Sequence, residues 1–243
     1  MEPDFRIVPN PMAAYRAAAH FFAAFAREAV AKRGRFSVAL AGGGTPRAMH
    51  SVLAAEPKGV VPWDKTSVFF GDERALPPDD ADSNYHMAWE TLLAHVPVDR
   101  SRVFRMQGEA ADLEEAALRY EADLRRETPD GLDLIFLGMG EDGHAASLFP
   151  GTAALDETER WVVAVTGPPG VLSPRRITMT LPAIAQARRA LFVVTGVAKR
   201  NALMRVRGRT EPLLPAARVR ARETLLWIVD EAAAGVPAPE RGP

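Results

Sequence analysis

The chain has 243 residues, of which 47% are hydrophobic and 25% are charged, so it has the composition of a globular protein with a sizeable core. A formal net charge of -1 provides no overall attraction to nucleic acid or to an anionic membrane, and we expect the chain to bind neither. The sequence has no cysteine, which excludes disulfides, thiolate nucleophiles and cysteine zinc sites, and shows neither a membrane span nor a signal peptide, so we expect a cytoplasmic protein.

The N-terminal part of the chain predicts a helix, a strand and an anion site. Residues 12–32 are rich in alanine and carry larger apolar side chains at helical spacing, and residues 36–41 form a short apolar strand. Three glycines and a Thr-Pro pair then lead into a second helical stretch. The amides of Gly43 and Gly44, the Thr45 hydroxyl and the helix N-terminus suit a bound anion, although a simple tight turn has the same pattern. The spacing fits neither a P-loop nor a dinucleotide-binding loop.

A second strand is predicted at residues 66–70, and it ends in the charged sequence GDER, which includes Asp72 and Arg74. The polar loop that follows contains three aspartates but lacks the Gly and the terminal Glu of an EF-hand, so we predict no metal there. A helix is expected next, over about residues 84–94.

A buried strand is predicted at residues 132–137, after a possible short strand at 103–106 and an amphipathic helix at 112–126. Its nearly continuous apolar run is typical of a parallel strand that is covered on both faces. It ends in GMGEDGH, where the glycines permit a sharp turn and where Asp142 and His144 follow. Open α/β sheets bind ligands at this end of a strand. The local pattern alone fits an ordinary polar turn with a solvated histidine equally well.

The C-terminal part of the chain supplies further strands and basic residues. The strands are predicted at residues 161–165, 177–181, 190–195 and 224–229. Arg175 and Arg176 precede the second of them, and because neighbouring strand residues point to opposite faces, the sequence does not decide which arginine faces a ligand. Lys199 follows the third strand in a glycine-containing turn that also suits an anion. The Pro/Gly-rich tail at 233–243 is expected to fray.

Strands that alternate with helices predict one doubly wound, mostly parallel α/β sheet with helices on both faces, a Rossmann-like three-layer α/β/α fold. We expect a single domain over residues 1–243. The glycine-rich and charged segments all follow strands. Because the carboxyl ends of parallel strands share one edge of the sheet, we expect these segments to meet in one cleft.

Several motifs occur together in a fixed order along nearly the whole chain. They are GGGTP at 42–46, GDER at 71–74, SNY at 83–85, GMGEDGHAASLFPG at 138–151 and GVAKR at 196–200. With these motifs the chain resembles the 6-phosphogluconolactonases, which are related to the glucosamine-6-phosphate deaminases. The deaminases share the glycine loop and the DGH sequence, but they carry an Asn-Glu pair where this chain has Ser147, Leu148 and Phe149. The missing Glu argues against ring opening and aldose-ketose chemistry, because that chemistry would need its acid-base group.

The resemblance implies hydrolysis of 6-phospho-D-glucono-1,5-lactone without a cofactor or a metal. A lactone is an activated ester, so a neutral imidazole that takes a proton from water can suffice, and we assign this role to His144 with Asp142 orienting the ring. The oxyanion donors stay open between the glycine-loop amides and those of the DGH loop. We expect the phosphorylated substrate to be bound by Gly43, Gly44, Thr45, Asp72, Arg74, Arg176 and Lys199.

Three alternatives remain at this point. The first is a sugar-phosphate deaminase or isomerase, and the second is a non-catalytic regulator that binds a sugar phosphate. The third is a metal hydrolase that uses Asp72, Glu73, Asp142 and His144, although one histidine with scattered acids is a weak ligand set. We expect the protein to act as a monomer.

Overall fold

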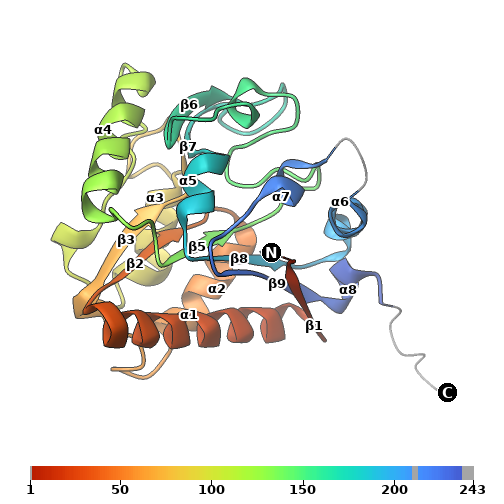
Figure 1. Cartoon of the computed structure of the whole chain (residues 1–243), viewed down its shortest axis with the longest axis horizontal. Helices are drawn as coiled ribbons and strands as arrows, with labels where there is room; N and C mark the ends of the chain where they lie inside the picture. Colours follow the sequence, from red (N-terminus) through yellow and green to blue (C-terminus); the bar gives the residue numbers. More distant parts are fainter. Residues whose placement is uncertain (1, 210–212, 237–243) are drawn as a thin grey trace.

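The computed structural model describes residues 2–209 and 213–236. A six-stranded parallel sheet in the order β1-β9-β8-β5-β2-β3 lies at its centre (Figure 1). The strands are β1 (Asp4–Val8), β2 (Phe36–Leu40), β3 (Thr66–Phe70), β5 (Leu134–Leu137), β8 (Arg189–Val194) and β9 (Thr224–Asp230). This arrangement confirms the predicted doubly wound, mostly parallel α/β fold.

Three strands form a separate antiparallel sheet in the order β4-β7-β6. They are β4 (Asp72–Arg74), β6 (Val162–Thr166) and β7 (Arg175–Met179). The sequence did not predict that these strands form a sheet of their own. Successive side chains point to opposite faces of a strand in both parallel and antiparallel sheets, so this alternation does not tell the two apart. β4 follows β3 almost directly, so the small sheet begins at the carboxyl edge of the large one.

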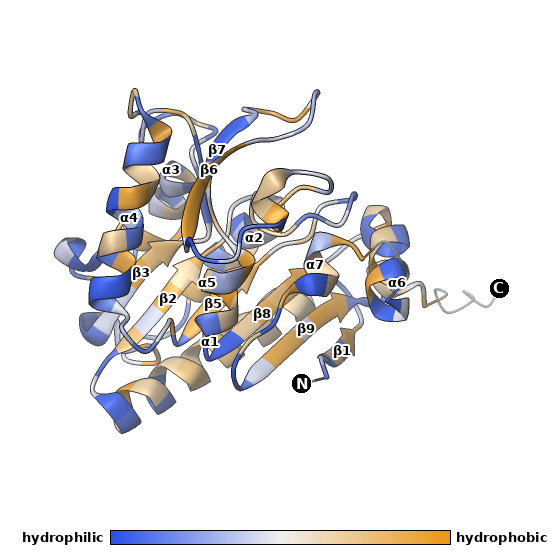
Figure 2. Ribbon diagram, turned by 45° about the horizontal axis from the view of Figure 1, so that its top comes forward, coloured by the Kyte–Doolittle hydropathy of each residue, from blue (hydrophilic) through white to orange (hydrophobic). Residues whose placement is uncertain are grey.

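Alternate residues of each central strand enter two different hydrophobic cores. In β5, Leu134 and Phe136 belong to the core beneath α1 (Pro11–Arg33) and α2 (Gly44–Ala54), whereas Ile135 and Leu137 belong to the core on the other face. Burial on both faces is the reason why β5 is apolar throughout. Figure 2 shows the same property as a largely hydrophobic sheet between helices that carry hydrophilic outer sides.

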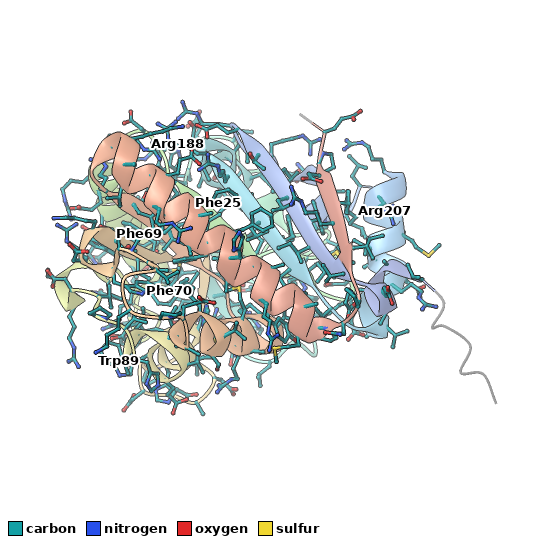
Figure 3. All side chains as sticks on the ribbon, turned by 90° about the horizontal axis from the view of Figure 1, so that it is seen from below. Phe25, Phe69, Phe70, Trp89, Arg188 and Arg207 are labelled. Carbon is teal, nitrogen blue, oxygen red and sulfur yellow. The ribbon has the colours of Figure 1, made fainter. Side chains whose placement is uncertain are left out.

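The helices cover both faces of the sheet, as the fold class requires. α1 and α2 lie on one face together with α3 (Asn84–Ala88), and Figure 3 shows α1 running across that face. The other face is covered by α4 (Leu113–Glu127), α5 (Leu181–Gln186), α6 (Arg200–Gly208) and α7 (Pro215–Arg218). Among the described residues, none of these helices combines the length and the apolar character needed to cross a membrane.

α1 matches the helix predicted at 12–32 closely, because its ends carry clear signals. The Asn10 side chain accepts a hydrogen bond from the N–H of Ala13, and Gly34 ends the helix with a φ of 71°. The small alanine side chains on its buried face let the helix lie close to the sheet, and larger side chains such as Phe22 fill the spaces between them.

Several local predictions differ from the structure. The sequence did not predict β1, which lies at the edge of the sheet and pairs only with β9. Its polar residues Asp4 and Arg6 interrupt the apolar run that is typical of a buried strand. The predicted strand at 103–106 is wrong: Val103 forms only an isolated bridge with Val68. The helix predicted at 84–94 is α3 followed by a π-helical turn, Trp89–Leu93.

The predicted C-terminal tail at 233–243 lies only partly within the described residues. Residues 231–234 form the short helix α8 (Glu231–Ala234), so this part of the chain is ordered beyond the start of the predicted tail. Residues 237–243 of that tail lie outside the described residues. The single domain over the whole chain therefore stays a prediction.

The strand order creates a crevice at the carboxyl edge of the sheet. From β2 the chain continues to β3 on one side, whereas β5 pairs with β2 on the other side. The loops that follow β2 and β5 therefore leave a gap between them, which is where open α/β sheets bind ligands. These two loops contain the glycine motif and the DGH motif.

Candidate active site

A cavity of about 350 Å³ lies at this edge of the sheet. All of the residues predicted to act or bind line it except Asp142, namely Gly43, Gly44, Thr45, Asp72, Arg74, His144, Arg176 and Lys199. They come from the segments that follow three parallel strands, β2, β5 and β8, and from β4 and β7 of the small antiparallel sheet. The cleft expected from the strand exits is thus present as one cavity.

The glycine loop provides amide donors at one side of the cavity. Gly43 has a φ of 98° and precedes α2, whose N-terminus receives no side-chain cap. The first amides of an uncapped helix lack intrahelical partners, so they can donate to an anion. The Thr45 hydroxyl lies 3.2 Å from that of Thr195, which follows β8. An anion held here would therefore contact the segments that follow β2 and β8, the two strands on either side of β5.

His144 and Asp142 form a hydrogen-bonded pair on the loop after β5. The imidazole Nδ1 lies 2.6 Å from Asp142 Oδ1, and the His144 backbone N–H donates to the same oxygen over 3.1 Å. Because an ionised carboxylate can only accept, this contact assigns the proton of a neutral imidazole to Nδ1 and leaves Nε2 as the free acceptor.

The electrostatics of the pair favour an ionised Asp142. Partial burial tends to raise the pKa of Asp142, but the hydrogen bonds from the side chain and backbone of His144 outweigh it, and the pKa lies below its usual value. Asp142 thus stays charged beside His144 at neutral pH and stabilises the ring when it takes a proton.

Asp72 lies in a buried hydrogen-bond network that the sequence did not reveal. Its Oδ2 accepts from the Ser147 hydroxyl at 2.5 Å and lies 3.6 Å from Arg176 Nη1. Asn84 donates to Asp72 Oδ1 at 3.3 Å and to its backbone carbonyl at 2.9 Å. Ser147 and Asn84 therefore fix Asp72 at the cavity wall. Both belong to motifs of the resemblance, but no local pattern gives them a role.

Asn84 also explains one glycine of the first loop. A Cβ on Gly42 would lie 1.9 Å from Asn84 Oδ1, so only glycine permits this close approach. The contact joins the glycine loop to the residues around Asp72. Gly42 is thus needed for space beside Asn84, whereas Gly43 is needed for its positive φ.

The antiparallel pairing of β4 with β7 decides which arginine faces the cavity. Arg74 lies opposite Arg176 in this ladder, and opposite residues share a face of the sheet. Arg175 is exposed and lines a different surface depression, so the ambiguity left by the sequence is resolved in favour of Arg176.

Arg176 is almost fully buried, and most of its donors already have partners. Its Nη2 donates to the Leu172 carbonyl at 2.6 Å and its Nε to the Ser173 carbonyl at 3.0 Å. Burial lowers the pKa of Arg176, and the neighbouring Asp72 opposes that shift. The guanidinium therefore holds the loop before β7 in addition to facing the cavity.

Arg74 and Lys199 have more donors available. Arg74 Nη1 donates to the Asp82 carbonyl at 2.6 Å, whereas its buried Nε has no hydrogen-bond partner. Lys199 is half-buried and makes no ion pair within the described residues. The ammonium of Lys199 can therefore donate to an anionic ligand at the cavity wall.

Glu73, the remaining acid of GDER, has a structural role. Its carboxylate accepts from the N–H groups of Asn84 and Tyr85, each at 2.8 Å, and from the Ser83 hydroxyl at 3.0 Å. These bonds cap the N-terminus of α3. Burial raises the pKa of Glu73, and the three donors oppose this shift. In the part of the chain that the structure describes, no three His, Asp or Glu side chains are grouped so that they could hold a metal ion.

Chemically, the cavity joins a base to an anion site. His144 Nε2 can accept a proton from a water molecule, while the glycine loop, Thr45 and Lys199 can hold an anionic group in the same cavity. A substrate that is both phosphorylated and electrophilic fits this combination. The individual roles of these residues remain predictions.

Comparison with known proteins gives consistent results. Residues 9–227 match the family described as glucosamine-6-phosphate isomerases/6-phosphogluconolactonase. A 6-phosphogluconolactonase from Mycobacterium tuberculosis is 39% identical over 221 residues, which cover 86% of this chain and 89% of that protein. A probable chloroplastic 6-phosphogluconolactonase from Oryza sativa subsp. japonica is 37% identical over 231 residues, covering 88% of this chain and 70% of that protein.

Solved structures agree with the sequence relatives. The 6-phosphogluconolactonase from Thermotoga maritima has a TM-score of 0.84 and 28% identity, and the match covers 94% of this chain and 100% of that one. A monomeric glucosamine-6-phosphate deaminase also matches, with a TM-score of 0.82 but 22% identity, which shows a shared fold only.

Proposed function

The chain belongs to the glucosamine-6-phosphate isomerase/6-phosphogluconolactonase family, and we propose that it hydrolyses 6-phospho-D-glucono-1,5-lactone to 6-phospho-D-gluconate. This reaction is the second step of the oxidative pentose phosphate pathway. The observation that carries the proposal is that His144, whose ring is hydrogen-bonded to Asp142, lines the same cavity as the glycine loop and Lys199. The curated relatives of similar length carry the same activity in their names.

His144 acts as the general base. A water molecule bound at Nε2 loses a proton to the imidazole as its oxygen attacks the lactone carbonyl carbon, and the imidazolium then returns that proton to the ring oxygen that leaves. Asp142 holds the ring by its hydrogen bond to Nδ1 and stabilises the imidazolium. No covalent intermediate is needed, because the lactone is already an activated ester.

The phosphate of the substrate binds at the glycine loop. A dianion needs several donors, and the amides near Gly43 and Gly44, the Thr45 hydroxyl and Lys199 supply them from the segments that follow β2 and β8. Arg74 and Arg176 add positive charge at the cavity wall. Asp72, fixed by Ser147 and Asn84, is placed to accept from sugar hydroxyls.

A coupled assay tests the proposed activity. Dehydrogenation of glucose 6-phosphate supplies fresh lactone, and formation of the open-chain product is followed with and without the protein. We expect clear acceleration over spontaneous hydrolysis, and His144→Ala should lose roughly 100- to 10,000-fold of it, the usual contribution of a general base. If the wild-type protein gives no acceleration, the proposed function is wrong.

A second assay addresses the deaminase alternative. The protein is incubated with glucosamine 6-phosphate and ammonia release is measured, for which we expect no signal. We further propose that the enzyme acts as a cytoplasmic monomer without a cofactor, as the sequence predicts. Light scattering of the purified chain measures the oligomeric state, and a dimer mass would contradict that part of the proposal.

A further inference from the structure

Phe149 is a buried aromatic residue at the wall of the active-site cavity. Its side chain is only 1% exposed, and its ring lies 4.7 Å from the His144 imidazole, centroid to centroid, at an interplanar angle of 49°. Because the ring touches the proposed base directly, it can influence where that base points.

The loop after β5 folds back on itself to bring Phe149 to His144. Ala145 and Leu148 form an antiparallel bridge, and Ala146 between them has a φ of 49°, which is uncommon for a residue with a Cβ. The Phe149 carbonyl then accepts from the Thr152 hydroxyl at 2.9 Å. The position of the Phe149 ring is thus fixed by backbone geometry on both sides.

The imidazole of His144 is held from three directions. Asp142 accepts at Nδ1, the backbone of Gly140 lies against Nδ1 and Cε1, and the Phe149 ring packs against the ring of His144. One hydrogen bond at Nδ1 fixes one atom of the ring but still permits rotation about that bond. The aromatic contact removes this freedom, because rotation would bring the two rings into overlap.

The same aromatic ring has fixed neighbours on its other sides. The Arg176 guanidinium carbon lies 5.5 Å from the Phe149 centroid, and a Cβ on Gly167 would lie only 3.0 Å from Phe149 Cε2. Arg176 is itself anchored by the carbonyls of Leu172 and Ser173. Loss of the Phe149 ring would therefore free His144 but leave Arg176 in place.

We infer that Phe149 is a positioning residue for His144, which holds Nε2 toward the bound lactone. This inference rests on the proposed function. A base that is displaced by about 1 Å can lose roughly 100-fold in rate, so the contact matters for kcat. Substrate affinity depends on the phosphate site, which Phe149 does not form, so KM should change little.

The kinetic test compares two phenylalanine variants. Phe149→Leu keeps an apolar side chain but removes the ring, and we expect kcat to fall about 10- to 100-fold with KM within about threefold. Phe104→Leu is the matched control. This substitution also removes one ring of an aromatic pair, since the Phe104 ring lies 4.7 Å from that of Phe69, but Phe104 does not line the cavity. Its kcat should equal that of the wild type.

A second measurement reports on His144 without using activity. The NMR signal of the His144 Cε1 proton, identified by its loss in His144→Ala, should move in Phe149→Leu because the ring current of Phe149 is gone and the imidazole samples more orientations. It should not move in Phe104→Leu. If Phe149→Leu does not fold, Phe149→Met, which also removes the ring but fills more of its space, takes its place.

Three outcomes would overturn the inference. They are a kcat for Phe149→Leu within about twofold of the wild type, an equal loss in Phe104→Leu, or a kcat loss with an unchanged His144 signal. The proposed function fails separately, if wild-type protein does not accelerate hydrolysis or if His144→Ala keeps full turnover. In that case the NMR comparison still decides whether the Phe149 ring lies against His144.

Discussion

The imidazole of His144 lies so close to the backbone of Gly140 that no other residue fits there: a Cβ on Gly140 would be 2.1 Å from Nδ1 and 2.3 Å from Cε1 of His144. The same Cβ would also lie 2.4 Å from Asp142 Oδ1. The φ of Gly140 is not positive, so the requirement is for space and not for an unusual backbone conformation. Gly140 thus permits the hydrogen bond between the base and its carboxylate partner.

Gly140→Ala should therefore inactivate the enzyme. The new methyl group must displace His144, Asp142 or the loop by about 1 Å, and we expect kcat to fall roughly 100-fold or more while the protein stays folded. Gly71→Ala is the matched control, because a Cβ there meets its nearest atom at 3.6 Å, an ordinary contact. Lactone turnover and thermal unfolding of both variants check the prediction. Wild-type turnover in Gly140→Ala would show that the pair tolerates displacement.

Asp142→Asn tests the tautomer of His144. The amide can donate to Nδ1, which would move the proton of the neutral imidazole to Nε2 and remove the free acceptor. We expect kcat to fall about 100-fold, less than in buried triads because Asp142 is partly exposed. Because the pKa of Asp142 is lowered, its charge is retained at any pH above its ordinary value of about 4, so Asp142 should not cause any loss of wild-type activity above that pH. A full-rate Asp142→Asn enzyme would refute the assigned tautomer.

Lys199→Gln tests the phosphate site. Removal of one charge-assisted hydrogen bond to a phosphate costs about 1.5 to 3 kcal/mol, so KM should rise roughly 10- to 100-fold with little change in kcat. Arg200→Gln is a close control, since Arg200 donates to the Ala232 carbonyl at 3.4 Å and does not line the cavity. Binding of the product by calorimetry should weaken in the first variant alone. An equal effect in both would point to general electrostatic attraction instead.

Much of the fold could be predicted because buried parallel strands have a strong local pattern. The run at 132–137 is apolar at almost every position, since β5 faces two cores, and it was recognised for that reason. β1 has no such pattern, because an edge strand with Asp4 and Arg6 is only partly buried. The small sheet was not separated from the large one, because its strands are short and partly exposed and would fit an edge of the large sheet equally well.

The sequence predicted the cavity residues that lie just after a strand, because the ends of the strands could be recognised. Contacts between distant segments were not: Ser147 reaches Asp72 across 75 positions of sequence, and the choice of Arg176 over Arg175 depends on its register with Arg74. Asn84 was visible only as part of a motif without an assigned role. Such roles follow from three-dimensional pairing, which a single sequence does not contain.

His50 provides a stability prediction away from the chemistry. It is fully buried in α2, its Nε2 has no hydrogen-bond partner, and burial lowers its pKa from 6.5 to about 3. A buried neutral imidazole makes the folded state bind fewer protons than the unfolded state at mildly acidic pH.

Acidification should therefore destabilise the protein through His50. The stability that its neutral form contributes is fully present above about pH 6.5 and is lost as the pH falls toward about 3. Between about pH 7.5 and about pH 5 the expected loss is about 2 kcal/mol, because the unfolded histidine gains its proton over that range. His50→Leu should show a free energy of unfolding that falls by about 2 kcal/mol less than that of the wild type over the same range, measured by urea unfolding. The same pH dependence in both proteins would contradict the prediction, because it would mean that His50 takes up its proton as readily in the folded state as in the unfolded state.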